Sequence, residues 1–231
     1  MMDLLLIRHG ETAWNRVRRM QGHIDIPLNE VGQRQAQALG DALSVVPVQA
    51  VYASDLQRAR DTAQAVANSH ALTVSLHTSL RERCYGAFEG LLYAHISERY
   101  PQAFAQWRAR EPGARFPAGE REAETLQEFH QRSVEAVTHI MRSHEASDAE
   151  ADSTHTQHGA VVIVTHGGVL DCLYREARGM TLEAERNFGI VNAAINHLQW
   201  DGQRFHVLTW ADATHLEAAG LDEIDRSHPA A

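Results

Sequence analysis

The chain has 231 residues, of which 44% are hydrophobic and 22% are charged, and its formal net charge is −9. This composition predicts one soluble globular domain with a sizeable core, although two small domains also fit the length. No apolar run approaches the roughly 20 residues that span a bilayer, and we expect no signal peptide because the first ten residues lack a basic region and a cleavage site. The negative charge disfavours nucleic acid and anionic membranes as partners.

The chain contains only two cysteines, Cys84 and Cys172. Two cysteines exclude a multi-disulfide framework and a four-cysteine zinc site, and they fit a reducing compartment. We therefore expect a cytoplasmic protein, either a monomer or a homodimer, in which plain packing is the role of both cysteines.

Short apolar runs rich in β-branched residues alternate along the chain with amphipathic helical patterns. We expect strands at residues 4–8, 50–53, 73–76 and 160–165, and a hairpin of residues 193–200 and 204–210. We expect helices at residues 29–43, 55–67, about 120–144, and 168–178. Strands that read as continuous apolar runs are typical of a parallel sheet covered on both faces. The pattern predicts an α/β fold, a three-layer α/β/α sandwich with a mostly parallel central sheet and a helical lid insertion.

The domain organisation follows from the same pattern. We expect one domain over residues 1–216 and a C-terminal tail over 217–231. Residues 83–120 are rich in aromatic side chains and would form a lid that determines specificity, with Arg108 and Arg110 as the residues that select the substrate. The polar, acidic segment 145–159 predicts a mobile loop.

Charged side chains and histidines follow four strands at their carboxyl ends. In an open α/β sheet these ends meet at one edge, where ligands bind. Clustered cations beside helix N-termini predict an anion site, and a phosphoryl group is the obvious anion. Gly10, Gly167 and Gly168 would let backbone N–H groups approach it. The residues are Arg8 and His9 after the first strand, Arg58 and Arg60 after the second, Arg81, Glu82 and Arg83 after the third, and His166 after the fourth.

Each of these features has a plain structural alternative. A histidine at a strand end is more often structural than catalytic, and an arginine in the first turn of a helix usually pairs with a surface carboxylate. What favours a functional site is that four successive strand ends carry the same kind of chemistry.

Four motifs also carry a family resemblance. They are "RHGET..N" (8–15), "SDL.RAR.T" (54–62), "LRE...G..EG" (80–90) and "VTHGG" (164–168). In this order and spacing they resemble the histidine phosphatase superfamily, the phosphoglycerate-mutase-like group, and they look closer to its small-molecule phosphatases. The motifs cover roughly the first three quarters of the chain, and four separated motifs are far more specific than one.

The resemblance implies a role for each motif residue. His9 would be the nucleophile that forms a phosphohistidine, with its other ring nitrogen donating to a loop carbonyl such as that of Gly10. Glu82 would protonate the leaving alkoxide and then activate water, which requires burial to raise its pKa against the neighbouring arginines. The phosphoryl oxygens would be held by Arg8, Arg58 and a protonated His166, and further phosphate or substrate contacts would come from Asn15, Gln21, Gly22 and Gly167.

The implied reaction needs no metal and no cofactor, because arginines supply the positive charge and the sequence shows no dense cluster of metal ligands. The expected partner is a small-molecule phosphomonoester. The implied function is therefore a metal-independent phosphomonoesterase for a small phosphorylated metabolite.

Two alternative functions stay open, a phosphoglycerate mutase and a non-catalytic binding module, and a third, a serine hydrolase, is disfavoured. "ERCYG" (82–86) partly resembles a mutase motif, so a phosphoglycerate mutase is the main alternative, but the lysine and the proline-rich insertion of mutases are missing. "FPAGERE" (116–122) resembles a phosphatase motif. A serine hydrolase would need G-x-S-x-G, which is absent. A non-catalytic phosphate-binding module would bind phosphate without turnover.

Overall fold

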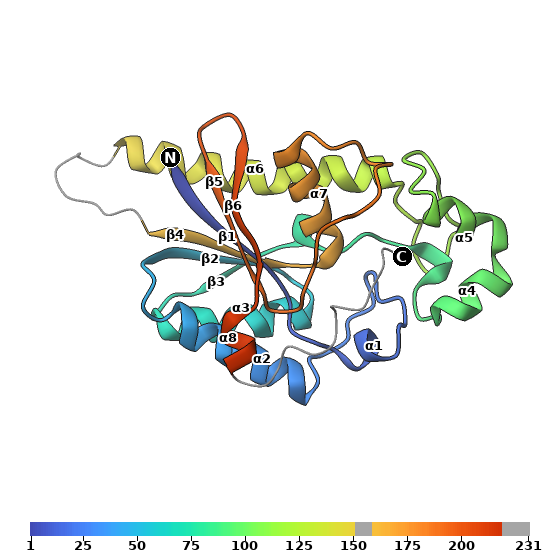
Figure 1. Cartoon of the computed structure of the whole chain (residues 1–231), viewed down its shortest axis with the longest axis horizontal. Helices are drawn as coiled ribbons and strands as arrows, with labels where there is room; N and C mark the ends of the chain where they lie inside the picture. The colour runs from blue at the N-terminus through green and yellow to red at the C-terminus, as the bar shows by residue number, and fades with distance from the viewer. Residues whose placement is uncertain (151–158, 219–231) are drawn as a thin grey trace.

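A six-stranded sheet forms the centre of the computed structural model, which describes residues 1–150 and 159–218 (Figure 1). The strand order is β3-β2-β4-β1-β5-β6. The first four strands of this order run parallel, and β5 and β6 continue the sheet as an antiparallel hairpin. The predicted α/β class and mostly parallel sheet are confirmed. The strands are β1 (Met2–Arg8), β2 (Val48–Ser54), β3 (Val74–His77), β4 (Ala160–Thr165), β5 (Ile195–Trp200) and β6 (Phe205–Asp212).

Helices cover both faces of the sheet (Figure 1). The helices α2 (Glu30–Leu43) and α3 (Gln57–Ser69) lie against one face, and α6 (Leu126–Glu150) and α7 (Gly167–Arg178) lie against the other. The short helix α8 (Thr214–Ala218) packs beside α2. These layers form the expected three-layer sandwich.

The side chains of β1 alternate between the two layers. Leu4 and Leu6 pack with the apolar side chains of α6 and α7, whereas Leu5 and Ile7 pack with those of α2 and α3. Each fully buried aliphatic side chain contributes about 1.5–3 kcal/mol. All six residues of β4 are buried. A strand covered on both faces has no polar side, which is why β1 and β4 read as unbroken apolar runs.

Helix α6 differs from its expected span of about 120–144. It starts at Leu126 because Thr125 caps it: the Thr125 hydroxyl accepts from the Glu128 N–H at 3.1 Å, and the Glu128 carboxylate accepts from the Thr125 N–H at 2.8 Å. This capping box fixes the helix start. The helix continues to Glu150, so the expectation of a loop from residue 145 is wrong for residues 145–150.

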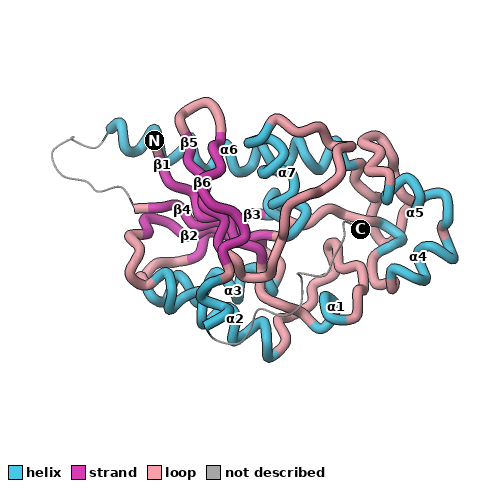
Figure 2. The backbone as a smooth tube through the Cα atoms, in the orientation of Figure 1, coloured by secondary structure: helices cyan, strands magenta, loops and turns pink. Residues whose placement is uncertain are grey.

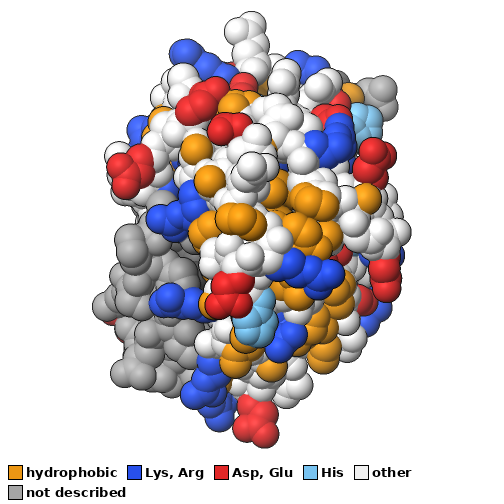
Figure 3. All heavy atoms as spheres, turned by 90° about the vertical axis from the view of Figure 1, so that its right-hand side faces the viewer, with side chains coloured by type: hydrophobic (Ala, Val, Ile, Leu, Met, Phe, Trp, Pro, Cys, Tyr) orange, Lys and Arg blue, Asp and Glu red, His pale blue; other side chains and the backbone are white. Residues whose placement is uncertain are grey.

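The segment 83–120, called the lid segment below, lies at one end of the molecule as a unit of short helices and loops (Figure 2). Its buried aromatic side chains pack on one another, and the Phe88 and Phe116 rings stack with centroids 4.6 Å apart. Figure 3 views this end, where hydrophobic side chains gather with Arg side chains among them. Its elements are a 3-10 turn (Gly86–Phe88), α4 (Tyr93–Arg99) and α5 (Pro101–Arg108). The remaining short elements of the described chain are α1 (Ala13–Arg16) and a 3-10 turn (Thr78–Leu80).

The rest of the expected loop, residues 151–158, and the tail residues 219–231 lie outside the described residues. Among the described helices, none is long and apolar enough to span a bilayer.

Candidate active site

The pairing of β1 with β4 places two histidines side by side. Arg8 lies opposite Thr165 in the parallel register, and the His9 N–H donates to the Thr165 carbonyl at 2.9 Å. His166 directly follows the last residue of β4, so both imidazoles leave the sheet at the same point. Their ring centroids are 5.1 Å apart. The carboxyl ends of the two central strands therefore form the floor of the site.

The His9 imidazole is buried and held in one tautomer. Its Nδ1–H donates to the Gly10 carbonyl at 2.7 Å, because a carbonyl oxygen can only accept. Burial, together with the positive charges of Arg58 and Arg8, lowers the pKa of His9 well below its ordinary value of 6.5. The ring is therefore neutral near pH 7, and its Nε2 carries a lone pair rather than a proton. This is the state that a nucleophilic imidazole requires.

Arg58 stands in the first turn of α3, directly after the end of β2, and is completely buried. Its Nη2 donates to the Gly22 carbonyl at 2.9 Å and its Nη1 to the Ile24 carbonyl at 3.0 Å. Burial lowers its pKa to about 10, although the charges of Glu82 and Asp25 oppose this shift. The guanidinium is therefore still a cation at neutral pH, held rigidly in the wall of the site.

Arg8 supplies a second cation at the end of β1. Its Nη1 donates to the Ile190 carbonyl at 2.7 Å, which fixes the guanidinium beside Gly167 at the start of α7. Arg8, Arg58 and Gly167 all line one cavity of about 220 Å³, together with His9 and Glu82. Two fixed cations beside a helix N-terminus make this cavity suitable for an anion.

The expectation that His166 is protonated is wrong for the protein without ligand. Burial, Arg58 and His9 lower the pKa of His166 well below 6.5, so the ring is neutral. Both ring nitrogens are buried, and neither has a hydrogen-bond partner among the described residues. Leaving a buried polar group unpaired costs about 1–3 kcal/mol. A ligand oxygen that accepted a hydrogen bond from this ring would remove that cost.

The Glu82 carboxylate faces the same cavity from the loop that follows β3. Its Oε2 accepts from the Gly168 N–H at 3.0 Å, and its Oε1 accepts from the Arg83 N–H at 2.8 Å. A Cβ on residue 168 would come within 2.2 Å of this carboxylate, so only glycine permits the approach. The carboxylate is thus anchored to α7, the helix that begins directly after His166.

Two of the three glycines predicted to approach an anion have another role. The Gly168 N–H binds Glu82, and the Gly10 N–H donates to the Thr62 hydroxyl at 3.0 Å. Their N–H groups serve the protein's own side chains, so that expectation is wrong for Gly10 and Gly168.

Three arginines at the strand ends are committed elsewhere. Arg60 is 46% exposed and pairs with Asp61, and Arg81 makes a bidentate pair with Asp55. Arg83 donates to the carbonyls of Glu124 and Ala114. The cluster is therefore smaller than the sequence predicts. Arg60 and Arg81 do not line the cavity, and Arg83 lines it but makes no side-chain hydrogen bond to the Glu82 carboxylate.

The other predicted contact residues, Asn15, Gln21 and Gly22, all line the cavity. Asn15 belongs to a capping box with Thr12 at the start of α1, and Gln21 accepts from the Thr12 hydroxyl at 3.1 Å. These contacts place the polar side chains at the cavity wall. The fold therefore brings Arg8, His9, Asn15, Gln21, Gly22, Arg58, Glu82 and Gly167 to one cavity, with His166 beside His9.

Two residues that support His9 were not assigned a role from the sequence. The Thr62 hydroxyl donates to the Arg58 carbonyl at 2.7 Å while it accepts from Gly10, so it joins α3 to the His9 loop. The Asn192 side chain donates to the His9 carbonyl at 2.7 Å. Thr62 is the last residue of the motif "SDL.RAR.T", so the motif could have identified it as part of the site. Nothing in the sequence around Asn192 predicts its contact with His9.

No group of three or more His, Cys, Asp or Glu side chains in residues 1–150 and 159–218 is arranged to hold a metal ion. The cavity offers guanidinium groups and the His9 imidazole to a negatively charged ligand, and its lining includes two carboxylates, those of Glu82 and Asp171.

Known proteins that are similar to this chain in sequence or structure include phosphatases and a phosphoglycerate mutase-like protein. Phosphoglycerate mutase-like protein 4 of Arabidopsis thaliana is 34% identical over 222 residues, which cover 95% of this chain and 89% of the relative. A metal-independent phosphoserine phosphatase of the same plant is 32% identical, with coverage of 95% and 85%. The solved structure of a mycobacterial glucosyl-3-phosphoglycerate phosphatase is 30% identical, covers 92% of this chain and all of that chain, and superposes with a TM-score of 0.76.

The family model of the histidine phosphatase superfamily (branch 1) matches residues 4–213, a range that contains all four motifs and all or most of every strand. The chain therefore belongs to branch 1 of the histidine phosphatase superfamily.

Proposed function

We propose that the protein is a metal-independent phosphomonoesterase that acts on a small phosphorylated metabolite through a phosphohistidine intermediate. The observation that carries this proposal is the neutral His9 ring, whose Nδ1–H is fixed on the Gly10 carbonyl, in a cavity that Arg8 and Arg58 also line and with the His166 ring 5.1 Å away. The relatives named as phosphatases support the hydrolytic direction.

In the first step, the Nε2 lone pair of His9 attacks phosphorus in line, and the bond from phosphorus to the ester oxygen breaks. Arg8, Arg58 and His166 hold the three equatorial oxygens, where negative charge is concentrated. Glu82 gives its proton to the leaving oxygen, so the product leaves as an alcohol. His9 then carries the phosphoryl group.

In the second step, water attacks the phosphorus and the bond to His9 breaks. The ionised Glu82 takes a proton from this water, which returns the carboxyl group to its starting state. Inorganic phosphate is released and the His9 ring is neutral again. The same carboxylate thus serves both half-reactions, and neither requires a metal ion.

The cavity wall around the leaving group favours a substrate with a second anionic group. Seven arginines line the cavity, but only two carboxylates do, although the whole chain has a net charge of −9. Arg8 and Arg58 serve the phosphoryl group, and Arg18, Arg19 and Arg110 also line the cavity. Arg19 donates to the Gly90 carbonyl at 2.6 Å, and Arg110 pairs with Asp171 at 2.6 Å. A phosphorylated hydroxy acid or amino acid carries a carboxylate suited to them. Phosphoserine and glucosyl-3-phosphoglycerate, named for two relatives, have this chemistry.

We expect hydrolysis to survive the removal of metal ions and to prefer carboxylate-bearing esters. Phosphate release would be measured with EDTA on phosphoserine, 2- and 3-phosphoglycerate, and neutral-alcohol analogues such as ethyl phosphate. A second anion held by one arginine predicts a preference of about 10-fold or more in kcat/KM. Interconversion of the two phosphoglycerates faster than hydrolysis would instead favour the mutase, and phosphate binding without turnover would favour the binding module.

We also expect the His9 ring to stay neutral as the pH falls through 6.5, because burial and two nearby cations oppose its protonation. ¹⁵N-histidine NMR would follow the ring nitrogens, with His9→Asn used to assign the signal. The predicted spectrum shows protonated Nδ1 and unprotonated Nε2, with a midpoint well below 6.5. A midpoint at or above 6.5 would mean that the nucleophile is charged over the working range, against the proposed mechanism.

A further inference from the structure

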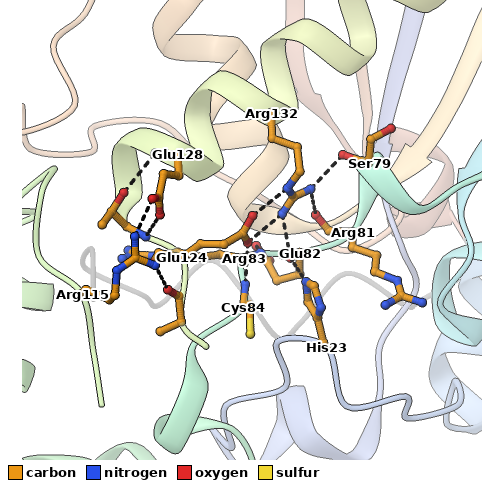
Figure 4. A network of polar contacts seen from close by, with 12 residues as sticks. His23, Ser79, Arg81, Glu82, Arg83, Cys84, Arg115, Glu124, Glu128 and Arg132 are labelled. Carbon is orange, nitrogen blue, oxygen red and sulfur yellow. Dashed lines mark hydrogen bonds and ion pairs between the residues drawn. The ribbon is translucent and has the colours of Figure 1, made fainter. Parts of the chain in front are cut away.

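The loop that carries Glu82 has no strand neighbour to bind its backbone. It follows the 3-10 turn Thr78–Leu80 and crosses the carboxyl end of the sheet before it enters the lid segment. Buried backbone carbonyls need a hydrogen-bond partner, so each carbonyl of residues 79–82 must be satisfied from elsewhere. Side chains from other elements do this, and Figure 4 shows how they converge on the loop.

Arg132, near the start of α6, satisfies three of these four carbonyls. Its Nη1 donates to the carbonyls of Ser79 at 2.8 Å and Arg81 at 3.0 Å, and its Nη2 donates to the carbonyl of Glu82 at 3.3 Å. The fourth carbonyl, that of Leu80, accepts from the Thr165 hydroxyl at 2.7 Å. One guanidinium therefore holds the backbone on both sides of Leu80, including the residue that carries the carboxylate.

Glu124 fixes the guanidinium from the opposite side. Arg132 donates to both oxygens of its carboxylate, at 2.7 and 2.8 Å. The same carboxylate accepts from the Cys84 N–H at 2.8 Å, and the Glu124 N–H donates to the Cys84 carbonyl at 2.9 Å. Burial raises the pKa of Glu124, but the hydrogen bonds and charge of Arg132 outweigh it and hold that pKa below the ordinary value. The pair stays ionised at neutral pH.

A third contact comes from the loop that also binds Arg58. The His23 Nε2–H donates to the Glu82 carbonyl at 2.8 Å. The Glu82 backbone is thus held from α6 and from the 17–28 loop, while its carboxylate is held by Gly168. Neither Arg132 nor Glu124 lines the cavity, so their effect on the reaction can only be indirect.

We propose that the Arg132–Glu124 pair positions the general acid: it fixes the 79–84 loop so that the Glu82 carboxyl group meets the leaving oxygen. The inference rests on the proposed role of Glu82 and adds two positioning residues to it. A bidentate guanidinium is suited to this task because its planar donors are rigid and reach several acceptors at once. A lysine at this position would offer a point charge on a flexible stem and would satisfy fewer carbonyls.

The test uses the dependence of kcat/KM on the leaving group, because kcat/KM covers the steps up to release of the alcohol. Proton donation matters most for a poor leaving group and least for a stable phenolate. The substrates would be phosphoserine, phenyl phosphate, 4-nitrophenyl phosphate and 2,4-dinitrophenyl phosphate, and Glu82→Gln would serve as the reference. We expect Arg132→Ala to lose about 10–100-fold on phosphoserine but only a few-fold on 2,4-dinitrophenyl phosphate. Arg132→Lys should fall between wild type and Arg132→Ala.

Two control variants on α6 separate positioning from a general loss of structure. Arg142→Ala removes an exposed arginine that stacks on Trp200, far along the helix from the loop. Val137→Ala opens a cavity under the same helix but removes no hydrogen bond to the loop. Both should leave the leaving-group dependence as in wild type. If Arg132→Ala does not fold, Glu124→Gln, which keeps the shape of the side chain, provides the same test.

The outcomes distinguish this inference from the function on which it rests. If the loss of kcat/KM is much larger for phosphoserine than for 2,4-dinitrophenyl phosphate in both Glu82→Gln and Arg132→Ala, the result supports the role of Glu82 and the positioning role of the pair. A steep dependence in Glu82→Gln with an equal loss on every substrate in Arg132→Ala overturns the positioning role alone. If Glu82→Gln loses about the same fraction of kcat/KM on every substrate, Glu82 is not the general acid. That result overturns the role of Glu82 and, with it, the positioning role of the pair.

Discussion

Replacing His9 with asparagine is expected to lower kcat/KM by about 10⁴–10⁶-fold, because it removes the nucleophile itself. The asparagine amide occupies the place of Nδ1 and can still donate to the Gly10 carbonyl, but it has no atom at the position of Nε2. The loss would therefore come from chemistry rather than from collapse of the loop. His9→Ala should be equally inactive. The assay is phosphate release from phosphoserine and from 4-nitrophenyl phosphate.

The matched control is His206→Ala, which removes a histidine that bonds Asp201 on the β5–β6 hairpin, away from the cavity. It should stay within a few-fold of wild type. Inorganic phosphate should still stabilise His9→Asn against urea, because the cations remain. An asparagine variant that kept a tenth of the wild-type rate would show that another group attacks phosphorus.

Replacing Arg58 with methionine should lower kcat/KM by about 10²–10³-fold, the usual effect of removing one fixed donor to a charged transition state. Methionine fills most of the buried volume, so the core stays packed. It supplies no charge to the phosphoryl group and no donor to the carbonyls of Gly22 and Ile24. Arg58→Lys keeps the charge but not the fork of donors, so an intermediate loss is expected.

The same helix offers a control two residues away. Arg60→Met removes an exposed arginine whose ion pair with Asp61 lies at the surface, and its effect should stay within a few-fold. Urea unfolding with and without inorganic phosphate provides the second measurement. Phosphate at 100 times its Kd should stabilise wild type and Arg60→Met by about 2.7 kcal/mol. Full stabilisation of Arg58→Met would contradict the assignment of Arg58 to the phosphoryl group.

Much of the site could be predicted from the sequence because its residues lie at, or directly after, the carboxyl ends of strands. The apolar runs of β1 and β4 fix both strands in the core, and residues directly after two adjacent parallel strands must be neighbours. His9 and His166 follow from this rule, as does the position of Arg58 at the start of α3. The motifs then identify which of these residues belong to one site.

The direction of individual side chains could not be predicted in this way. Arg58 and Arg60 are two residues apart on α3, and only their rotation about the helix axis sends one into the cavity and the other to the surface. The charge of His166 depends on burial and on cations from β1 and α3, so its neutral state appears only when the elements are assembled. The Arg132–Glu124 pair joins α6 to a loop about 50 positions earlier, and no local pattern encodes that contact.

The start of α6 is a different case, because its signal was present in the sequence. Thr125 and Glu128 form a capping box that marks the first turn at Leu126. Apolar periodicity alone extends the helix backward to about residue 120. The local capping interaction, rather than the periodicity, decides where the helix begins.

The central claim is that His9 carries the phosphoryl group between the two half-reactions. Rapid acid-free quenching of the enzyme during turnover of phosphoserine, followed by proteolysis and mass spectrometry, would test it directly. The account predicts a phosphoryl adduct on the peptide that contains His9, labile to acid and stable to alkali, and absent from His9→Asn. Turnover at the full rate with no adduct on that peptide, or with an adduct on another residue, would contradict it.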